Sequence, residues 1–111
     1  MKPAYVYQGV VFRVIDGDTV EATIDLGFRL STTLPVRLAH INAPERNDEA
    51  GMAATAHLRS LVAHGGQTLF QTYKPFDKYG RFLADIYVDG LHVNQQMIDD
   101  GYAVAYEGEG H

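Results

Sequence analysis

Residues 10–24 of the chain read VVFRVIDGDTVEATI, and this stretch decides the fold. β-Branched and aromatic residues crowd its first half, and apolar residues alternate with polar ones in its second half, which predicts two strands. Between them, the Asp16-Gly17-Asp18 segment predicts a tight turn. We therefore expect a β-rich domain that opens with a strand over residues 8–15, a turn, and a strand over residues 19–24.

A third strand and a helix follow. Asp25-Leu26-Gly27 predicts a second turn, and residues 28–41 then predict a long strand. We expect this strand to bend near Pro35, because proline cannot donate to a central ladder. Apolar residues at helical spacing next predict a helix that Asn47 or Asp48 caps and that Gly65-Gly66 ends. The remaining predicted elements are two strands at residues 67–73 and 82–88, a short helix at 93–100 and an extended segment at 102–106.

Three strands, a helix and two more strands is the element order of the OB-fold, a five-stranded Greek-key barrel. The predicted fold class is therefore α+β and mainly β, with a helix between strands 3 and 4 and a short C-terminal helix. A chain of 111 residues with 46% hydrophobic residues predicts one domain, residues 1–111. Other small α+β folds can share this order, so the order alone does not settle the fold.

Composition limits the chemistry. Without cysteine, the chain can form neither disulfides nor thiolate metal sites, so a metal would be bound by oxygen or histidine. No signal-peptide core or membrane-length apolar run is present, which predicts a soluble protein, either cytoplasmic or secreted if a signal was removed. The net charge of −5 argues against broad electrostatic capture of nucleic acid. It does not exclude a nucleic-acid enzyme, because a bound cation and a few arginines can reverse the local sign.

Charged residues interrupt these apolar runs. Asp16 and Asp18 lie at a strand junction, where two carboxylates can supply hard oxygen ligands to Ca²⁺ or Mg²⁺; an ordinary Asp-Gly turn is the alternative. Arg37 lies in the third strand and by alternation shares a face with Pro35 and Ala39. It lies either on a solvated face or at the barrel surface, where its planar donor fork could bind a phosphate.

Two later segments leave similar alternatives open. Pro44 fixes the chain just before Glu45, whose carboxylate could activate a water as general base or could belong to an acidic surface. The loop Asp77-Lys78-Tyr79-Gly80-Arg81 combines cations with an aromatic ring, which suits phosphate contact and base stacking. An exposed hairpin loop could have the same composition. Each of these signals is weak when taken alone.

Together, these segments resemble the staphylococcal nuclease (thermonuclease) family. The resemblance spans residues 8–106 and rests on three motifs in the family's order: Val14-Ile15-Asp16-Gly17-Asp18-Thr19-Val20, Val36-Arg37-Leu38-Ala39-His40-Ile41-Asn42-Ala43-Pro44-Glu45 and Asp77-Lys78-Tyr79-Gly80-Arg81-Phe82-Leu83-Ala84-Asp85-Ile86-Tyr87, the last followed by Asp89-Gly90 and Val93-Asn94. It implies an SNase-like OB-fold nuclease domain that acts on DNA or RNA. Nothing in the sequence indicates a membrane or an obligate protein partner.

The resemblance also implies a Ca²⁺ site. Asp18 would be the principal carboxylate ligand, Asp16 a nearby outer-shell acid, and Ala43 a ligand through its backbone carbonyl. Asn42 stands where the family's usual second metal-binding aspartate would be. Its amide oxygen can still ligate Ca²⁺, but one negative charge is lost, so we expect weaker binding, and another divalent cation becomes possible.

The same resemblance implies roles in catalysis and substrate binding. Glu45 would be the general base that acts on the attacking water. Arg37 and Arg81 would bind the scissile phosphate and stabilise the charge that builds on its oxygens. The residues that would contact the substrate's other phosphate or base are Lys78, Tyr79 and Tyr106.

Two other classes of protein share parts of this pattern. A non-catalytic OB-fold module of the same ancestry would bind RNA, DNA or a protein, but such modules lose the acids and arginines that are present here. A domain that binds Ca²⁺ only for stability would leave the arginines unexplained. We therefore predict a Ca²⁺-dependent phosphodiesterase and expect an endonuclease. Many family members continue into a third helix beyond the equivalent of Tyr106, so this chain is either a compact relative or a truncated one.

Overall fold

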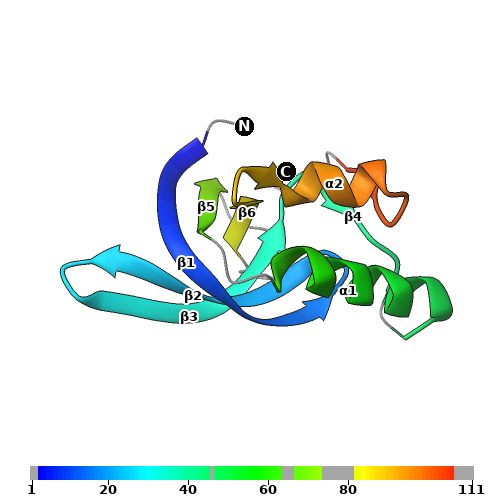
Figure 1. Cartoon of the computed structure of the whole chain (residues 1–111), viewed down its shortest axis with the longest axis horizontal. Coiled ribbons are helices and arrows are strands. Elements are labelled where there is room, and N and C mark those ends of the chain that lie inside the picture. The colour runs from blue at the N-terminus through cyan, green and yellow to red at the C-terminus, as the bar shows by residue number, and fades with distance from the viewer. Residues whose placement is uncertain (1–2, 46, 64–66, 74–81, 107–111) are drawn as a thin grey trace.

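The computed structural model describes residues 3–45, 47–63, 67–73 and 82–106. Figure 1 shows the strands gathered on one side and two helices on the other. In chain order the elements are β1 (Pro3–Asp16), β2 (Thr19–Gly27), β3 (Leu30–Leu38), β4 (Ile41–Asn42), α1 (Glu49–Val62), β5 (Thr68–Tyr73), β6 (Phe82–Val88), β7 (Leu91–His92), α2 (Val93–Asp99) and β8 (Val104–Ala105).

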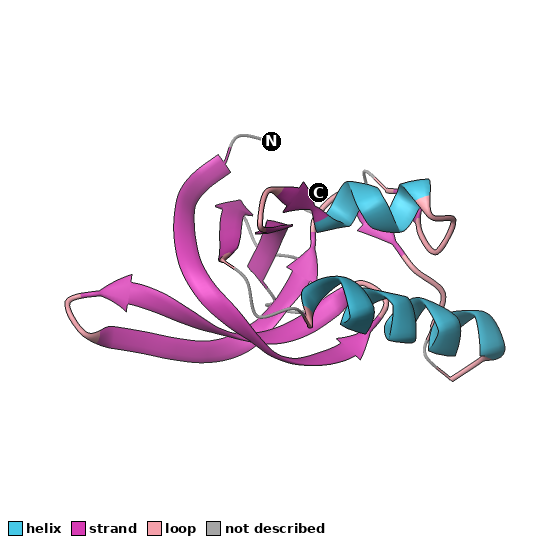
Figure 2. Ribbon diagram, in the orientation of Figure 1, coloured by secondary structure: helices cyan, strands magenta, loops and turns pink. Residues whose placement is uncertain are grey.

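Five strands close into a barrel, which confirms the OB-fold prediction. β1 pairs antiparallel with β2 along its C-terminal half and with β5 along its N-terminal half, and β5 pairs in turn with β6. A parallel pairing of β3 with β6 completes the ring, and it places Arg37 opposite Leu83. Figure 2 shows the strands as one curved body with both helices at the same end. The barrel therefore has one end that the helices cover.

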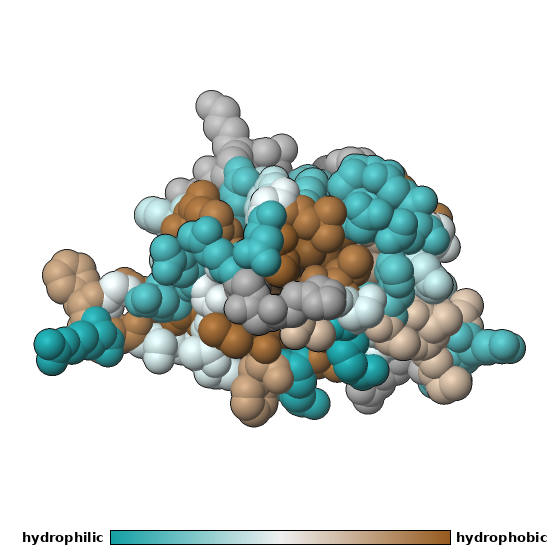
Figure 3. Space-filling view, in the orientation of Figure 1, coloured by the Kyte–Doolittle hydropathy of each residue, from teal (hydrophilic) through white to brown (hydrophobic). Residues whose placement is uncertain are grey.

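Alternation along the strands and packing by the helices build the core. Val20, Ala22 and Ile24 of β2 point inward and are buried, and Leu58 of α1 and Met97 of α2 are fully buried in the same cluster. Burial of such side chains is the main favourable term in folding, on the order of 2 kcal/mol each. On the face shown in Figure 3, hydrophilic residues gather over α2. Helix α2 thus has a hydrophilic outer surface on this face, and both helices bury apolar side chains against the barrel.

The predicted start of the first helix agrees with the structure, whereas Gly65-Gly66, which we expected to end it, lie outside the described residues. Asp48 is the N-cap of α1, and its carboxylate accepts a hydrogen bond of 2.7 Å from the Gly51 N–H. This bond satisfies one of the backbone donors that the first helical turn leaves without a partner. No helix in the described part of the chain is long and apolar enough to cross a membrane.

The predicted third strand over residues 28–41 is wrong at both ends. The chain leaves β3 after Leu38, turns at Ala39 and His40, and resumes as β4, which pairs with β8. The pairing of Pro35 with Glu21 of β2 is regular, so the strand has no bulge at Pro35. The contacts of β3 with β6 begin only at Val36, so the missing N–H of Pro35 falls where β3 has no partner on that side in the described structure.

The first strand and the second turn also differ from the prediction. β1 begins at Pro3 rather than residue 8, because β5, distant in sequence, supplies its partner there. β2 extends through the expected turn to Gly27, and the chain reverses at Phe28 and Arg29 instead. The carboxylate of Asp25 accepts a 2.8 Å hydrogen bond from the Gly27 N–H just before this reversal.

Gly17 lies between the two acids of the first turn, at the closest approach of that turn to α1. A Cβ added to Gly17 would lie 2.7 Å from the Cβ atoms of both Ala43 and Ala54. We therefore expect Gly17→Ala to lower the free energy of unfolding by about 1–3 kcal/mol through overpacking. Urea denaturation monitored by circular dichroism measures this change.

The double variant Gly17→Ala/Ala54→Gly is the matched control. It removes the contact with the helix, so it should be more stable than the sum of the two single losses predicts. Strictly additive losses would contradict close packing of the turn against α1.

Candidate functional site

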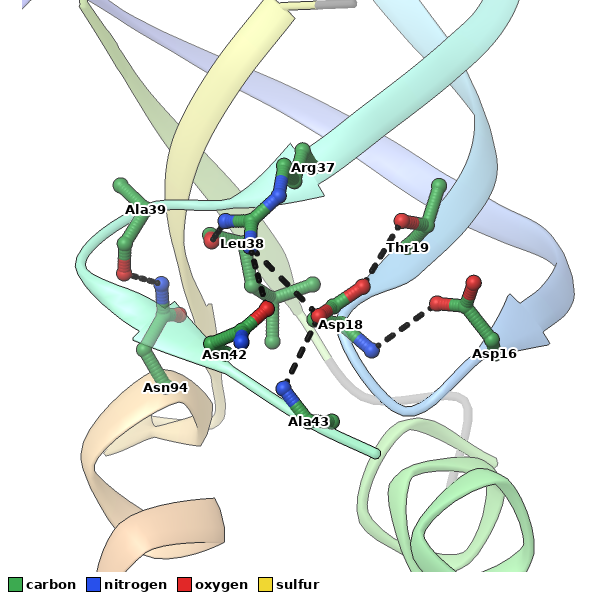
Figure 4. Close-up of polar contacts among 9 residues, drawn as sticks. All are labelled: Asp16, Asp18, Thr19, Arg37, Leu38, Ala39, Asn42, Ala43 and Asn94. Atoms are coloured by element: carbon green, nitrogen blue, oxygen red, sulfur yellow. Dashed lines mark hydrogen bonds and ion pairs between the residues drawn. The ribbon is translucent and has the colours of Figure 1, made fainter. Parts of the chain in front are cut away.

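The first turn directs the Asp18 carboxylate into the space between β3, β4 and α1. Figure 4 shows this side chain pointing toward Arg37 and Ala43, with Asp16 on its other side. Only 8% of Asp18 is exposed. One carboxylate oxygen accepts the Ala43 N–H at 2.9 Å, and the other accepts the Thr19 hydroxyl at 3.1 Å. Asp16 in turn accepts the Asp18 N–H at 3.1 Å, which fixes the turn itself.

Arg37 is buried rather than on a solvated face, with 6% of the residue exposed. Its Nη1 donates to the Leu38 carbonyl at 2.9 Å, and its Nη2 donates to the Asn42 side-chain oxygen at 3.2 Å (Figure 4). The same Nη2 lies 3.5 Å from the Asp18 carboxylate. Alternation correctly places Arg37 opposite Val36, but the segment after β3 folds back over that outer face and covers it.

Tyr106 also reaches this position. Its ring centre lies 5.6 Å from the guanidinium carbon of Arg37, within the range of a cation–π contact. Its backbone N–H donates to the His40 carbonyl at 2.8 Å, next to the β4–β8 pairing. The C-terminal segment of the described chain therefore forms part of the wall around Arg37.

Burial raises the pKa of Asp18 above its ordinary value of 3.8, and the neighbouring carboxylate of Asp16 raises it further. The Ala43 N–H and the Arg37 guanidinium lower this pKa, but they do not offset the rise. The ionised carboxylate therefore lacks full compensation from the groups around it.

The donors around Asp18 match a hard cation in chemical type. Asp18 supplies carboxylate oxygen, Asn42 an amide oxygen and Ala43 a backbone carbonyl, and oxygen is the ligand atom that Ca²⁺ takes in proteins. A cation at this position would also offset the unfavourable burial of the Asp18 charge. Within the described ranges, no group of three or more histidine or acidic side chains could hold a metal ion. A metal here would depend on one buried carboxylate and on neutral oxygens.

Of the remaining predicted site residues, the structure describes Glu45 alone. Glu45 is exposed just before α1, and its carbonyl accepts the Asp48 N–H at 3.4 Å. Arg81, Lys78 and Tyr79 lie outside the described residues. The structure brings together Asp16, Asp18, Arg37, Asn42, Ala43 and Tyr106.

Asn94 positions the backbone beneath this site and was not singled out as a site residue from the sequence. Its side-chain nitrogen donates to the carbonyls of Ala39 and Ala84 at 2.9 and 3.0 Å, and its side-chain oxygen accepts the Ile86 N–H at 2.9 Å. Only 2% of Asn94 is exposed. Helix α2 is thereby tied to β6 and to the turn that follows Arg37. In the sequence, Asn94 stands beside two further amides, Gln95 and Gln96, so its residue type alone did not mark it; its signal was its place in Val93-Asn94, after the third motif.

A second polar network, also missed from the sequence, lies on the outer face of β6. The buried Asp85 accepts a hydrogen bond from the Tyr73 hydroxyl, and its other oxygen lies 2.7 Å from Nε2 of His92. Burial and the Asp85 carboxylate raise the pKa of Tyr73. The ring of His92 stacks on Tyr87, with ring centres 4.7 Å apart. An aspartate inside the apolar run of residues 82–88 was the signal that could have revealed this network.

Comparison with known proteins identifies similar sequences. A family model described as "Staphylococcal nuclease homologue" matches residues 35–111. An "Uncharacterized endonuclease" of Escherichia coli O157:H7 is 41% identical over 100 residues, which cover 89% of this chain and 61% of that protein. A "Micrococcal nuclease" of Shigella flexneri is 32% identical over 109 residues, covering 90% of this chain and 59% of that protein. An "Uncharacterized endonuclease" of Haemophilus influenzae is 32% identical, covering 91% and 53%.

The chain thus spans between about half and three fifths of the length of these relatives. Each of them has further sequence outside the matched region. The similarity therefore concerns only the matched part of each relative, and not the activity of the whole protein.

The raised pKa of Asp18 predicts that its charge opposes folding. Because the folded-state pKa exceeds the ordinary value of 3.8, the carboxyl favours the folded state below pH 3.8, and this contribution is lost as the pH rises through the folded-state value. Asp18→Asn should therefore raise the thermal unfolding temperature at pH 7 in chelator, because the amide oxygen can still accept the Ala43 N–H. The advantage of the variant should shrink as the pH falls toward 3.8.

Asp99→Asn, at an exposed position of α2, is the control and should change the free energy of unfolding by less than about 0.5 kcal/mol. A lower unfolding temperature for Asp18→Asn at pH 7 would mean that the Arg37 ion pair outweighs the cost of burial.

Proposed function

The chain belongs to the family of staphylococcal nuclease homologues. From this premise we propose that it is a Ca²⁺-dependent endonuclease, which hydrolyses internal phosphodiester bonds of DNA or RNA. The relatives named as endonucleases and as a micrococcal nuclease support this proposal. The site around Asp18 and Arg37 is its proposed centre.

The observation that carries the proposal is the buried guanidinium of Arg37 between Asp18 and Asn42. An arginine carries five N–H donors, and the described residues accept hydrogen bonds from two nitrogens of this one. It therefore has donors left for a phosphate oxygen at the edge of the site. A structural arginine on a solvated face would not need a buried aspartate and an oriented amide beside it.

Hydrolysis of a phosphodiester requires that these residues neutralise the charge of the phosphate and activate a water that attacks it. The phosphate is anionic and repels hydroxide, so its charge must be neutralised before a water can attack it. Arg37 would donate to the phosphate oxygens in a planar fork, and stabilisation of the growing charge by fixed donors is usually the largest catalytic contribution. Arg81, which precedes Phe82 in the sequence, would act in the same way.

Ca²⁺, when bound, would polarise the phosphate and supply a further positive charge. Asp18 would hold it, with the side-chain oxygen of Asn42 and the carbonyl of Ala43 as neutral ligands. Asp16 would orient the turn that carries Asp18, as its hydrogen bond to the Asp18 N–H supports. Lys78, Tyr79 and Tyr106 would contact the substrate beyond the cleaved bond.

Glu45 would take the proton from the attacking water. It follows Pro44 at the exit of β4, so its backbone is restrained, while its exposed carboxylate is free to meet a water that arrives with the substrate. In the absence of substrate, a general base need not yet be in hydrogen-bond contact with its target.

Glu45→Ala should lower the rate of nucleic-acid cleavage by about 10²–10⁴-fold, the usual contribution of a general base. The assay incubates the protein with single-stranded DNA, double-stranded DNA or RNA, in Ca²⁺ or in chelator, and follows the release of shorter fragments. Chelator should abolish cleavage by the unaltered protein.

Glu49→Ala is the matched control, since Glu49 is an exposed acid four residues further on, in the first turn of α1, and its variant should keep the original rate. A pure protein that binds nucleic acid but cuts none of the three substrates with any of several divalent ions would instead be a non-catalytic module of this family.

Asn42→Asp should lower the Ca²⁺ concentration needed for half-maximal activity by about tenfold, because the added unit charge contributes on the order of 1 kcal/mol even in water-like surroundings. A titration of activity against Ca²⁺ measures the shift. Asn47→Asp, at an exposed position just before α1, adds the same charge elsewhere and should leave the curve in place. Unchanged Ca²⁺ dependence in Asn42→Asp would remove Asn42 from the metal site.

A further inference from the structure

The β2–β3 hairpin projects from the barrel on the side away from the two helices (Figure 1). Gly27 pairs with Leu30, so Phe28 and Arg29 alone form the tip. Both have positive φ, 53° for Phe28 and 62° for Arg29. Two successive residues of this conformation make a type I′ turn, which asparagine and glycine fill with least strain.

Phenylalanine and arginine are poor choices for this turn. A bulky side chain in the left-handed region crowds its own backbone, so such residues are uncommon there and are typically found where function requires them. The tip thus has a residue pair that folding alone does not favour.

The apolar side chain at the tip has no protein surface to pack on. Phe28 is 97% exposed, and Leu26 and Leu30 beside it are exposed as well. Arg29 is also exposed and forms no hydrogen bond or ion pair within the described ranges. At the end of the molecule where the hairpin projects, Figure 3 shows apolar and hydrophilic residues next to each other.

We propose that this tip is a second contact with the nucleic acid, remote from the cleaved bond. Phe28 inserts between stacked bases of a duplex, and Arg29 binds a phosphate or lies in the minor groove beside the opened step. An apolar wedge with a neighbouring arginine is the combination that minor-groove proteins use to unstack a base step. This inference rests on the proposed nuclease function.

The path of the hairpin strands favours the substrate as the occupant. β2 begins at Thr19, next to Asp18, and β3 ends just after Arg37, so both strands run from the proposed site to the tip. Gly27 lies eight residues beyond Thr19, which is up to about 26 Å along the strand. A duplex rises about 3.4 Å per base pair, so the wedge would contact the substrate about eight base pairs from the cleaved phosphate.

The tip is tested directly by measuring the binding of a duplex of about 24 base pairs. Such a duplex extends at least about eight base pairs to either side of a phosphate bound at its centre, so it reaches the tip in either orientation. Fluorescence anisotropy in Ca²⁺, with Glu45→Gln as background so that the duplex survives, measures the affinity. Phe28→Ala should weaken binding about tenfold, within the range of losses when one base-stacking aromatic is removed. A duplex that carries 2-aminopurine at successive positions should show one unstacked step, and Phe28→Ala should abolish that signal.

Two controls separate this contact from a structural role. Phe28→Asn/Arg29→Gly installs the residues that the turn prefers, so it should raise the thermal unfolding temperature and yet weaken duplex binding. Phe12→Ala removes a 66% exposed phenylalanine from β1, outside the hairpin, and should leave binding unchanged. With Glu45 intact, Phe28→Ala should cleave the small substrate thymidine nitrophenyl phosphodiester, which cannot reach the tip, at the original rate.

Several results would overturn the inference: unchanged duplex affinity in Phe28→Ala, retained affinity in Phe28→Asn/Arg29→Gly, or an equal loss on the small substrate. Dissociation of a dimer in Phe28→Ala, with unchanged duplex affinity, would make the tip a contact between copies of the chain instead. The binding and 2-aminopurine measurements do not depend on cleavage. If neither substrate is cut, the nuclease proposal fails, while these two measurements still decide the role of the tip.

Discussion

Burial of the Asp18 carboxylate is the constraint on which the arrangement of the site depends. Its oxygens accept the Ala43 N–H and the Thr19 hydroxyl, and its backbone carbonyl accepts the Leu38 N–H at 2.8 Å. One residue therefore joins the first turn, the end of β3 and the segment that enters α1. The same burial disfavours its charge, as the raised pKa indicates. A cation bound beside this carboxylate, as we propose, would offset the unfavourable burial of its charge.

The strand pairing that closes the barrel also fixes the position of Arg37. The parallel pairing with β6 places Arg37 opposite Leu83, and Asn94 then anchors the turn that follows it to α2. Parallel pairing needs a long connection, and here α1 and β5 lie in the chain between the two paired strands, β3 and β6. The surroundings of the proposed phosphate-binding group thus depend on a pairing between strands distant in sequence and on the C-terminal segment that carries Tyr106.

The sequence predicts what local patterns control and fails where distant partners decide. The Asp48 cap, the barrel order and the turn between Asp16 and Asp18 follow from composition and spacing, and the structure agrees with them. The start of β1, the end of β3 and the burial of Arg37 depend on strands and segments far along the chain, which alternation cannot reveal. The sequence marks Asp85 only as an acid inside an apolar run, and it marks Asn94 only by its place after the third motif. The roles of Glu45, Arg81, Lys78 and Tyr79 stay predictions from resemblance.

The hairpin that carries Phe28 and Arg29 has a further consequence for how such a protein can change over evolution or by design. Side chains alternate along each strand, so two residues added to β2 and two to β3 would lengthen the arm by about 7 Å without turning any core residue outward. A single added residue in one strand would instead invert that strand's inward and outward faces. The distance from the proposed site to the hairpin tip can therefore change in steps of two residues per strand. Such a change would not disturb the barrel core or the buried charges of Asp18 and Arg37. The length of the β2–β3 hairpin can therefore change while the rest of the domain keeps its structure.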